Sequence, residues 1–206
     1  MEAPALFTEF LEVCIHTILR LRGVYPDAIF AKHRAFGVAV HMSRHPDLNR
    51  YIQETLRAAR NLIEARAVGK VVLCLLDGAD EVVERYVFDV RDAPATSELD
   101  DLGNVAYVEH LMRSILIKLH LVDRQLPPPP KDGGTFTLLL YSRDDAQMRS
   151  FVATPDDGWV DVSAEPRLAQ PDPSPLIVPV KNVESPLLSF DFNVLVRPDS
   201  SRMDET

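Results

Sequence analysis

The stretch HPDLNRYIQETL, residues 45–56, combines a helix start with the beginning of an amphipathic helix. Pro46 suits a first helical turn because its missing N–H would have no partner there, and Asp47 favours the positive end of a helix dipole. Apolar residues then recur at intervals of three and four, which predicts one buried helical face. This stripe comprises Leu48, Tyr51, Ile52, Thr55, Leu56, Ala59, Leu62 and Ile63.

Two more long helices are predicted by the same periodicity, one on each side of this helix along the chain. Residues 6–21 form the first, which stops near Gly23, and residues 102–122 form the third. The four prolines of residues 127–130 end the third helix because proline cannot continue it. This proline run is interpreted as a stiff connector, and a polyproline ligand for a partner is the alternative.

Strand patterns fill the rest of the chain. Residues 71–76 and 82–90, joined by the turn-forming Asp77-Gly78-Ala79-Asp80, predict a hairpin whose first strand is well buried. Further strands are expected at residues 36–42, 135–141, 176–180 and 187–196. Three helices packed on a mostly antiparallel sheet make the predicted fold class α+β.

Composition bounds the class of protein. The 206 residues, 46% hydrophobic and 26% charged, suit one compact domain. The apolar run around Ile15 to Leu21 is interrupted by polar residues and is far shorter than the roughly 20 apolar residues of a membrane span. Because the first residues also lack a secretory signal pattern, we expect a soluble intracellular protein. The net charge of -9 argues against direct nucleic-acid binding.

No motif for catalysis, a metal or a cofactor emerges from the sequence. Cys14 and Cys74 sit among apolar neighbours and are interpreted as buried thiols. His41 and His45 are four residues apart, but Pro46 argues against the helix that would bring them to one metal. The turn accounts for Asp77 and Asp80. A non-enzymatic protein without cofactors is expected, and an enzyme whose site is assembled only in space stays an alternative.

Runs along most of the chain resemble the HORMA-domain accessory subunits of translesion DNA polymerase zeta. Residues 45–56 are the most specific of these, and the resemblance weakens between about 142 and 175. Spindle-checkpoint HORMA proteins are the nearest family alternative. The other runs are Phe10-Leu11-Glu12-Val13, Val24-Tyr25-Pro26, Ile29-Phe30, Lys70-Val71-Val72, Val87-Phe88, residues 108–113, Thr135-Phe136-Thr137, Trp159 and Pro179-Val180-Lys181.

This resemblance implies a single HORMA domain over residues 1–198. It implies a core of about residues 1–141 and a safety belt of about 142–198 that traps a partner peptide; residues 199–206 are predicted to be a disordered tail. The partner would add a strand to a sheet edge. The loose sequence pattern of residues 142–175 suits a belt that adopts two packings.

The implied function is that of a non-catalytic adaptor in translesion DNA synthesis, in the nucleus and also the cytoplasm. It would hold a proline-containing peptide of the polymerase zeta catalytic subunit and bridge it to the C-terminal domain of a Y-family inserter polymerase. The alternative is a spindle-checkpoint or cell-cycle regulator that traps peptides of mitotic proteins.

The resemblance also carries site residues. Tyr51 and Trp159 match the aromatic residues that line the family's peptide site, with Leu48 and Leu56 on the same predicted helix as Tyr51. Arg113 matches an arginine of the family's homodimer surface. Ile177, Asp191 and Asn193 match the surface for the inserter polymerase, where the family's Gln-x-Tyr is Asp191-Phe192-Asn193 here. For Tyr51 the alternative is plain core packing, and for Arg113 a solvated helix flank.

Overall fold

A computed structural model describes residues 3–93, 101–129, 134–143, 150–154, 158–162, 168 and 175–198. The predicted tail, residues 199–206, lies outside the described residues. The helices are α1 (Ala3–Leu21), α2 (Pro46–Glu64) and α3 (Asp101–Asp123), with a short 3-10 helix at Asp27–Ile29. The strands are β1 (Phe30–Ala35), β2 (Val38–Ser43), β3 (Val68–Leu76), β4 (Val82–Arg91), β5 (Thr135–Ser142), β6 (Ser150–Thr154), β7 (Gly158–Asp161), β8 (Leu176–Glu184) and β9 (Ser189–Val196).

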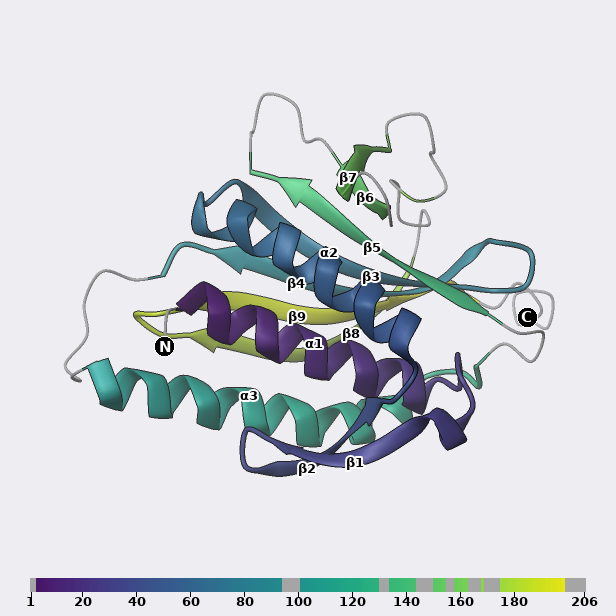
Figure 1. Cartoon of the computed structure of the whole chain (residues 1–206), viewed down its shortest axis with the longest axis horizontal. Coiled ribbons are helices and arrows are strands. Elements are labelled where there is room, and N and C mark those ends of the chain that lie inside the picture. The colour runs from purple at the N-terminus through teal and green to yellow at the C-terminus, as the bar shows by residue number, and fades with distance from the viewer. Residues whose placement is uncertain are drawn as a thin grey trace, which may run out of the picture.

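The main sheet holds seven antiparallel strands in the order β7-β6-β5-β3-β4-β9-β8. Helices α1 and α2 cover one face of it, and α3 runs alongside β8 and β9 (Figure 1). The ribbon of β1 and β2 forms a separate two-stranded sheet. This architecture confirms the predicted α+β class of three long helices on a mostly antiparallel sheet.

The core lies between the helices and the sheet and is rich in phenylalanine. Phe88 of β4 stacks on Phe192 of β9 with ring centroids 4.2 Å apart and planes 11° apart. Phe10 of α1 packs against Phe88 and against Phe190, both of which are buried. Each such ring removed from water contributes roughly 1.5–3 kcal/mol to folding. These contacts tie the C-terminal strand β9 to the first helix.

On the opposite face of the sheet lie Val162 and Leu168, two of the described residues between β7 and β8. Strands β7 and β8 themselves lie at opposite edges of the sheet. Val162 is buried on that opposite face in a cluster with Val72, Cys74 and Leu139. Farther along, the carbonyl oxygen of Leu168 accepts a hydrogen bond from Nη1 of Arg85 at 2.8 Å. Val162 and Leu168 therefore both contact the side of the sheet away from the helices.

The strand predicted at residues 36–42 is wrong in its bounds. The structure has a hairpin instead, with Phe36 and Gly37 at its turn and strands on both sides. Both turn residues have positive φ, 49° and 75°, as a tight two-residue hairpin requires. The sequence pattern did not indicate β1 because this strand lacks the alternation of apolar and polar residues. The ribbon stands away from the main sheet, so Lys32, His33 and Arg34 are all exposed.

His16 makes the stability of the fold sensitive to mild acid. Its imidazole is buried in α1, where Nδ1 accepts from the Ser43 N–H at 3.3 Å, and burial together with the nearby charge of His33 lowers its pKa to about 4. The unfolded chain therefore takes up this proton first. The stabilising contribution is full above pH 6.5 and declines as the pH falls toward 4.

We expect the titration of His16 alone to lower the free energy of unfolding by about 2 kcal/mol when the pH falls from 7 to 5. Urea titrations of the wild type and of His16→Gln across this range measure the effect, since glutamine offers an acceptor that does not titrate. The two proteins should differ in the slope of unfolding free energy against pH. Parallel slopes would show that His16 does not carry the effect.

Candidate peptide-binding site

The outer edge of β5 is only partly covered. On its inner side β5 pairs with β3 along residues 135–142, whereas on its outer side β6 pairs only with Leu139, Leu140 and Tyr141. Among the described strands, none pairs with residues 135–138 on that outer side. A strand edge of this type exposes main-chain donors and acceptors that an added strand would satisfy. The first half of β5 is therefore a candidate docking edge.

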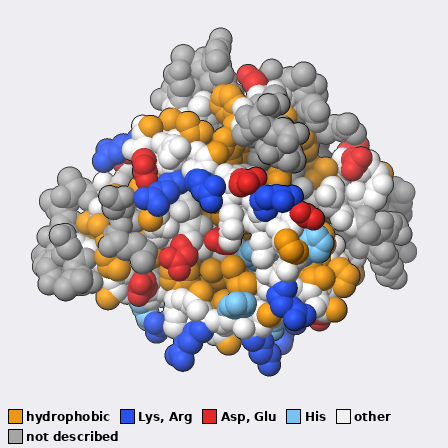
Figure 2. Space-filling view, viewed as in Figure 1, with side chains coloured by type: hydrophobic (Ala, Val, Ile, Leu, Met, Phe, Trp, Pro, Cys, Tyr) orange, Lys and Arg blue, Asp and Glu red, His pale blue; other side chains and the backbone are white. Residues whose placement is uncertain are grey.

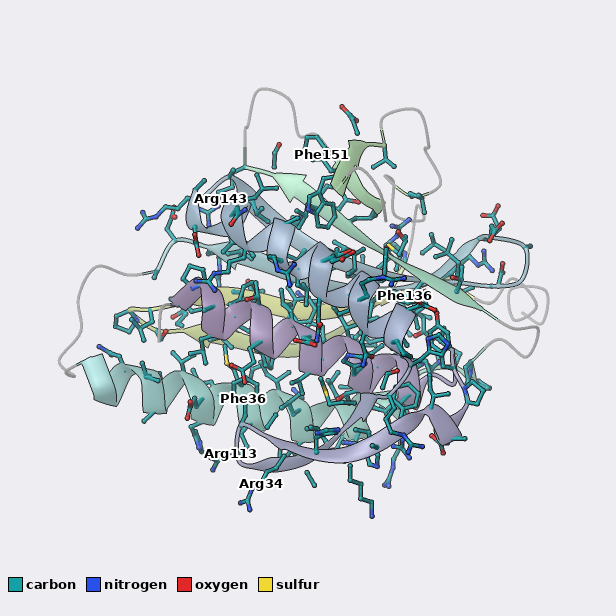
Figure 3. The ribbon with its side chains drawn as sticks, in the orientation of Figure 1. Arg34, Phe36, Arg113, Phe136, Arg143 and Phe151 are labelled. Carbon is teal, nitrogen blue, oxygen red and sulfur yellow. The ribbon has the colours of Figure 1, made fainter. Side chains whose placement is uncertain are left out.

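Tyr51 of α2 lies beside this open part of β5. Its ring meets Phe136 edge to face, with centroids 5.6 Å apart and an interplanar angle of 74°, and Tyr25 meets the same Phe136 at 6.3 Å. Burial raises the pKa of Tyr51 above its usual value. Hydrogen bonding to the Thr137 side chain and to the main chain of Leu138 lowers this pKa and so offsets only part of the rise. The half-buried phenol thus sits beside the uncovered residues of β5, in an aromatic cluster around Phe136, which Figure 3 labels.

Trp159 lies on β7, the strand at the end of the sheet nearest this edge. It pairs with Ala153 of β6, one residue beyond the position where β6 stops pairing with β5. The indole is half-buried and packs on the main core cluster, and β7 contacts α2. Its Nε1 is buried, and among the described residues none accepts a hydrogen bond from it. A buried indole N–H usually finds an acceptor, so this is an unsatisfied donor, and a peptide could reach it only if the packing around it opened.

Leu48 and Leu56 do not reach the surface of this site. Both belong to the core-facing stripe of α2 and are buried, with exposed fractions of 7% and 4%. Any effect of these leucines on a peptide would pass through the packing of α2. Phe136 and Tyr25, by contrast, were not predicted as site residues. The strand pattern of residues 135–141 indicated Phe136 as a strand residue, but only the packing of α2 shows that it meets Tyr51.

Arg113 is exposed on α3 and holds the turn of the β1–β2 ribbon. Its Nε donates to the carbonyl oxygen of Phe36 at 2.8 Å. A Cβ at Gly37 would lie 2.6 Å from the guanidinium, so glycine is needed for this approach. Ile117 and Leu121 follow Arg113 at four-residue steps and are 53% and 55% exposed. Arg113 is thus part of an exposed helical stripe with apolar character.

Ile177, Asp191 and Asn193 share one face of the β8–β9 hairpin. Asp191 and Asn193 alternate with buried residues of β9 and so point away from the helices. Ile177 is opposite Leu195, which has the same orientation, and is 60% exposed. Asp191 accepts from Nη2 of Arg91 at 3.0 Å, so its charge is balanced within the chain. The structure therefore brings the three residues onto one surface.

The structure also places the cysteines and the histidine pair considered in the sequence. Burial raises the pKa of both Cys14 and Cys74, the latter to about 11, as expected for inert buried thiols. His41 lies on β2, while His45 is the N-cap residue of α2, so the two do not share a helix. Within the described residues no group of three metal-ligating side chains comes together. The described helices include none that is long and apolar enough to cross a membrane.

Solved structures with this architecture include a crystal structure of the mitotic checkpoint complex. One of its chains matches with a TM-score of 0.75 at 23% identity, covering 95% of this chain and 99% of that one. C. elegans HTP-2 bound to HTP-3 closure motif 1 matches with a TM-score of 0.67 at 16% identity, covering 94% and 85%. At these identities the similarity concerns the fold.

Sequence comparisons give the family. The mitotic spindle assembly checkpoint protein MAD2B of Homo sapiens is 37% identical over 188 residues, covering 90% of this chain and 87% of its own length. The DNA polymerase zeta processivity subunit of Arabidopsis thaliana is 29% identical over 184 residues, covering 89% and 81%. The HORMA domain model matches residues 4–166. The chain therefore belongs to the HORMA-domain family, together with the relatives named MAD2B and DNA polymerase zeta processivity subunit.

Proposed function

We propose that this HORMA adaptor traps a proline-containing peptide of the polymerase zeta catalytic subunit at the open edge of β5. The supporting observation is the arrangement of its C-terminal part. Its described residues place β6 and β7 at one edge of the sheet and β8 and β9 at the other, and none of the described strands pairs with residues 135–138 of β5 on their outer side. A peptide added there would gain main-chain hydrogen bonds, and the safety belt expected over residues 142–198 would enclose it.

The side chains around this edge suit proline and apolar residues. Tyr51, Phe136 and Trp159 supply flat aromatic surfaces, and flat aromatic grooves are a common way to recognise proline-containing segments. Release of a peptide held behind this belt would require the belt to move, so dissociation should be slow. Such a protein acts by binding, and no catalytic step is part of the proposal.

The second half of the proposed function is a bridge to the C-terminal domain of an inserter polymerase. The face carrying Ile177, Asp191 and Asn193 points away from the helices on the edge hairpin β8–β9, whereas the peptide edge belongs to β5 on the other side of the central strands. One molecule could therefore hold both partners at once. Arg113 with Ile117 and Leu121 would form a separate homodimer surface on α3. The proposed cellular location is the nucleus and also the cytoplasm.

The test measures both partners on one sample. A labelled proline-containing peptide from the cognate catalytic subunit should bind the wild type and leave slowly, as followed by fluorescence anisotropy. The peptide-loaded protein should then bind the inserter domain, measured by calorimetry. Ile177→Glu should weaken binding of the inserter domain by at least about tenfold, because it puts a charge into an apolar contact. The affinity for the peptide should be unchanged.

Two outcomes would contradict this function. A folded wild type that binds no such peptide, yet retains peptides of mitotic proteins, would point to a cell-cycle regulator instead. Peptide binding without any inserter binding would keep the trap and remove the bridge. Arg57→Glu is the matched control for Ile177→Glu, because Arg57 is exposed on α2, away from the β8–β9 hairpin.

A further inference from the structure

The β1–β2 ribbon has a second open strand edge, remote in sequence from the first. Among the described strands β1 pairs with β2 alone, and it is β2 that packs on α1 and α3. In Figure 1 the ribbon of β1 and β2 runs along the lower rim of the molecule. Its three central residues are exposed. The outer side of β1 is therefore accessible to an extended chain.

The hairpin register shows which residues face outward. In a two-residue hairpin the flanking pair, here Ala35 and Val38, is hydrogen-bonded, and bonded and non-bonded pairs then alternate. The bond from the Arg44 N–H to the Ile29 carbonyl, 2.7 Å, has the phase that this alternation requires. Lys32 and Arg34 fall in the non-bonded pairs. Their main-chain N–H and C=O groups thus point away from β2, toward solvent.

This edge is cationic in an acidic protein. Residues 30–44 contain Lys32, Arg34 and Arg44 together with His33 and His41, and no Asp or Glu, although the chain has a net charge of -9. Lys32 and Arg34 are two residues apart and so share one face of the strand, with His41 directly across from Lys32. Figure 2 shows Lys, Arg and His side chains gathered on the lower rim, where the ribbon lies in Figure 1.

We propose that the outer edge of β1 is a strand-docking site for an extended acidic segment of a partner protein. Such a strand would pair with the outward main-chain groups of Lys32 and Arg34. Its residues directly opposite would lie about 4.5–5.5 Å from theirs between Cβ atoms, a distance that favours opposite charges. The partner should therefore carry Asp or Glu at every second position. Edge cations repel a basic strand, which makes the site selective.

The test uses the full-length protein and a short labelled peptide that alternates Glu and Val. Lys32→Glu/Arg34→Glu should weaken its binding by at least about tenfold in fluorescence anisotropy, because both pairings become repulsive. Arg57→Glu/Arg66→Glu changes the net charge equally at exposed positions outside the ribbon and should retain binding. Unchanged circular dichroism of both double variants establishes that each is folded.

Strand pairing is distinguished from simple charge attraction by a second peptide. N-methylation of its alternate residues on the docking side removes main-chain donors but leaves every carboxylate, and it should also weaken binding at least about tenfold. Equal binding of the methylated peptide, equal losses in the two double variants, or equal binding of a single-stranded oligonucleotide would each overturn the proposal. Since this edge is separate from β5, these outcomes are independent of the proline-peptide experiment.

Discussion

Replacing Arg22 by methionine should lower the free energy of unfolding by about 3–5 kcal/mol. Arg22 follows α1 and is buried, with a side chain 4% exposed. Its Nε donates to Glu84 of β4 at 3.0 Å, its Nη1 to Asp123 of α3 at 2.9 Å, and its Nη2 to the Pro127 carbonyl at 2.6 Å. One guanidinium thus joins the ends of two helices to the sheet.

The expected loss is large because of what the substitution leaves behind. The Glu84 side chain is also only 4% exposed. Without Arg22 it would keep the hydrogen bond that the Tyr86 hydroxyl donates to it at 2.8 Å, but that neutral donor does not balance its charge. Burial by itself would lower the pKa of Arg22, but the hydrogen bond and charge of Glu84 raise it. A carboxylate left buried without its counter-charge is costly.

Chemical denaturation followed by circular dichroism measures this effect. Arg22→Met/Glu84→Leu should recover most of the loss, because the double variant removes both charges and keeps apolar volume. Arg50→Met is the matched control, since the Arg50–Asp47 pair has side chains 65% and 69% exposed and should contribute less than about 0.5 kcal/mol. A loss from Arg22→Met no larger than that of the control would refute the role of the buried network.

Replacing Trp159 by alanine should weaken binding of the proline-containing peptide by about 2–4 kcal/mol, mostly through faster release. Trp159 is the only tryptophan in the chain and packs beside the point where β6 leaves β5, and its indole N–H has no acceptor within the described part of the chain. Alanine would remove both the flat apolar surface and this donor. Anisotropy titrations and dissociation rates give the affinity and its kinetic origin.

Two conservative variants separate the contributions at this site. Trp159→Phe keeps an aromatic surface and removes the N–H, so its loss measures the hydrogen bond and should be smaller than that of alanine. Tyr51→Phe removes only the hydroxyl beside Thr137 and Leu138 and should retain the packing against Phe136. If Trp159→Ala bound the peptide as tightly as the wild type, the peptide would have to lie elsewhere on the protein.

The helices could be predicted because their signals are local. The stripe of α2 and its start at Pro46 are visible in the sequence, and the helix runs to Glu64. The buried hairpin of β3 and β4 was predicted at 71–76 and 82–90 and extends a few residues further at its ends. Strand β1 could not be predicted in this way, because a protruding ribbon needs no alternation of apolar and polar residues.

The candidate sites depended on information that no local pattern contains. A resemblance of motifs indicated Tyr51 and Trp159, but their relation to the edge of β5 follows from the packing of α2 and β7. Likewise Asp191 appeared in the sequence as an added charge, and only the sheet shows Arg91 beside it.

The sequence by itself determined the α+β class, the three helices, most strands and the membership in a HORMA-type family, because periodicity and motifs are properties of neighbouring residues. The tertiary structure decided the order of the described strands, which of their edges stay open, and on which face of the sheet Val162 is buried. These features arise from contacts between residues far apart in the chain. Their energies depend on which surfaces meet, and a linear pattern does not state that.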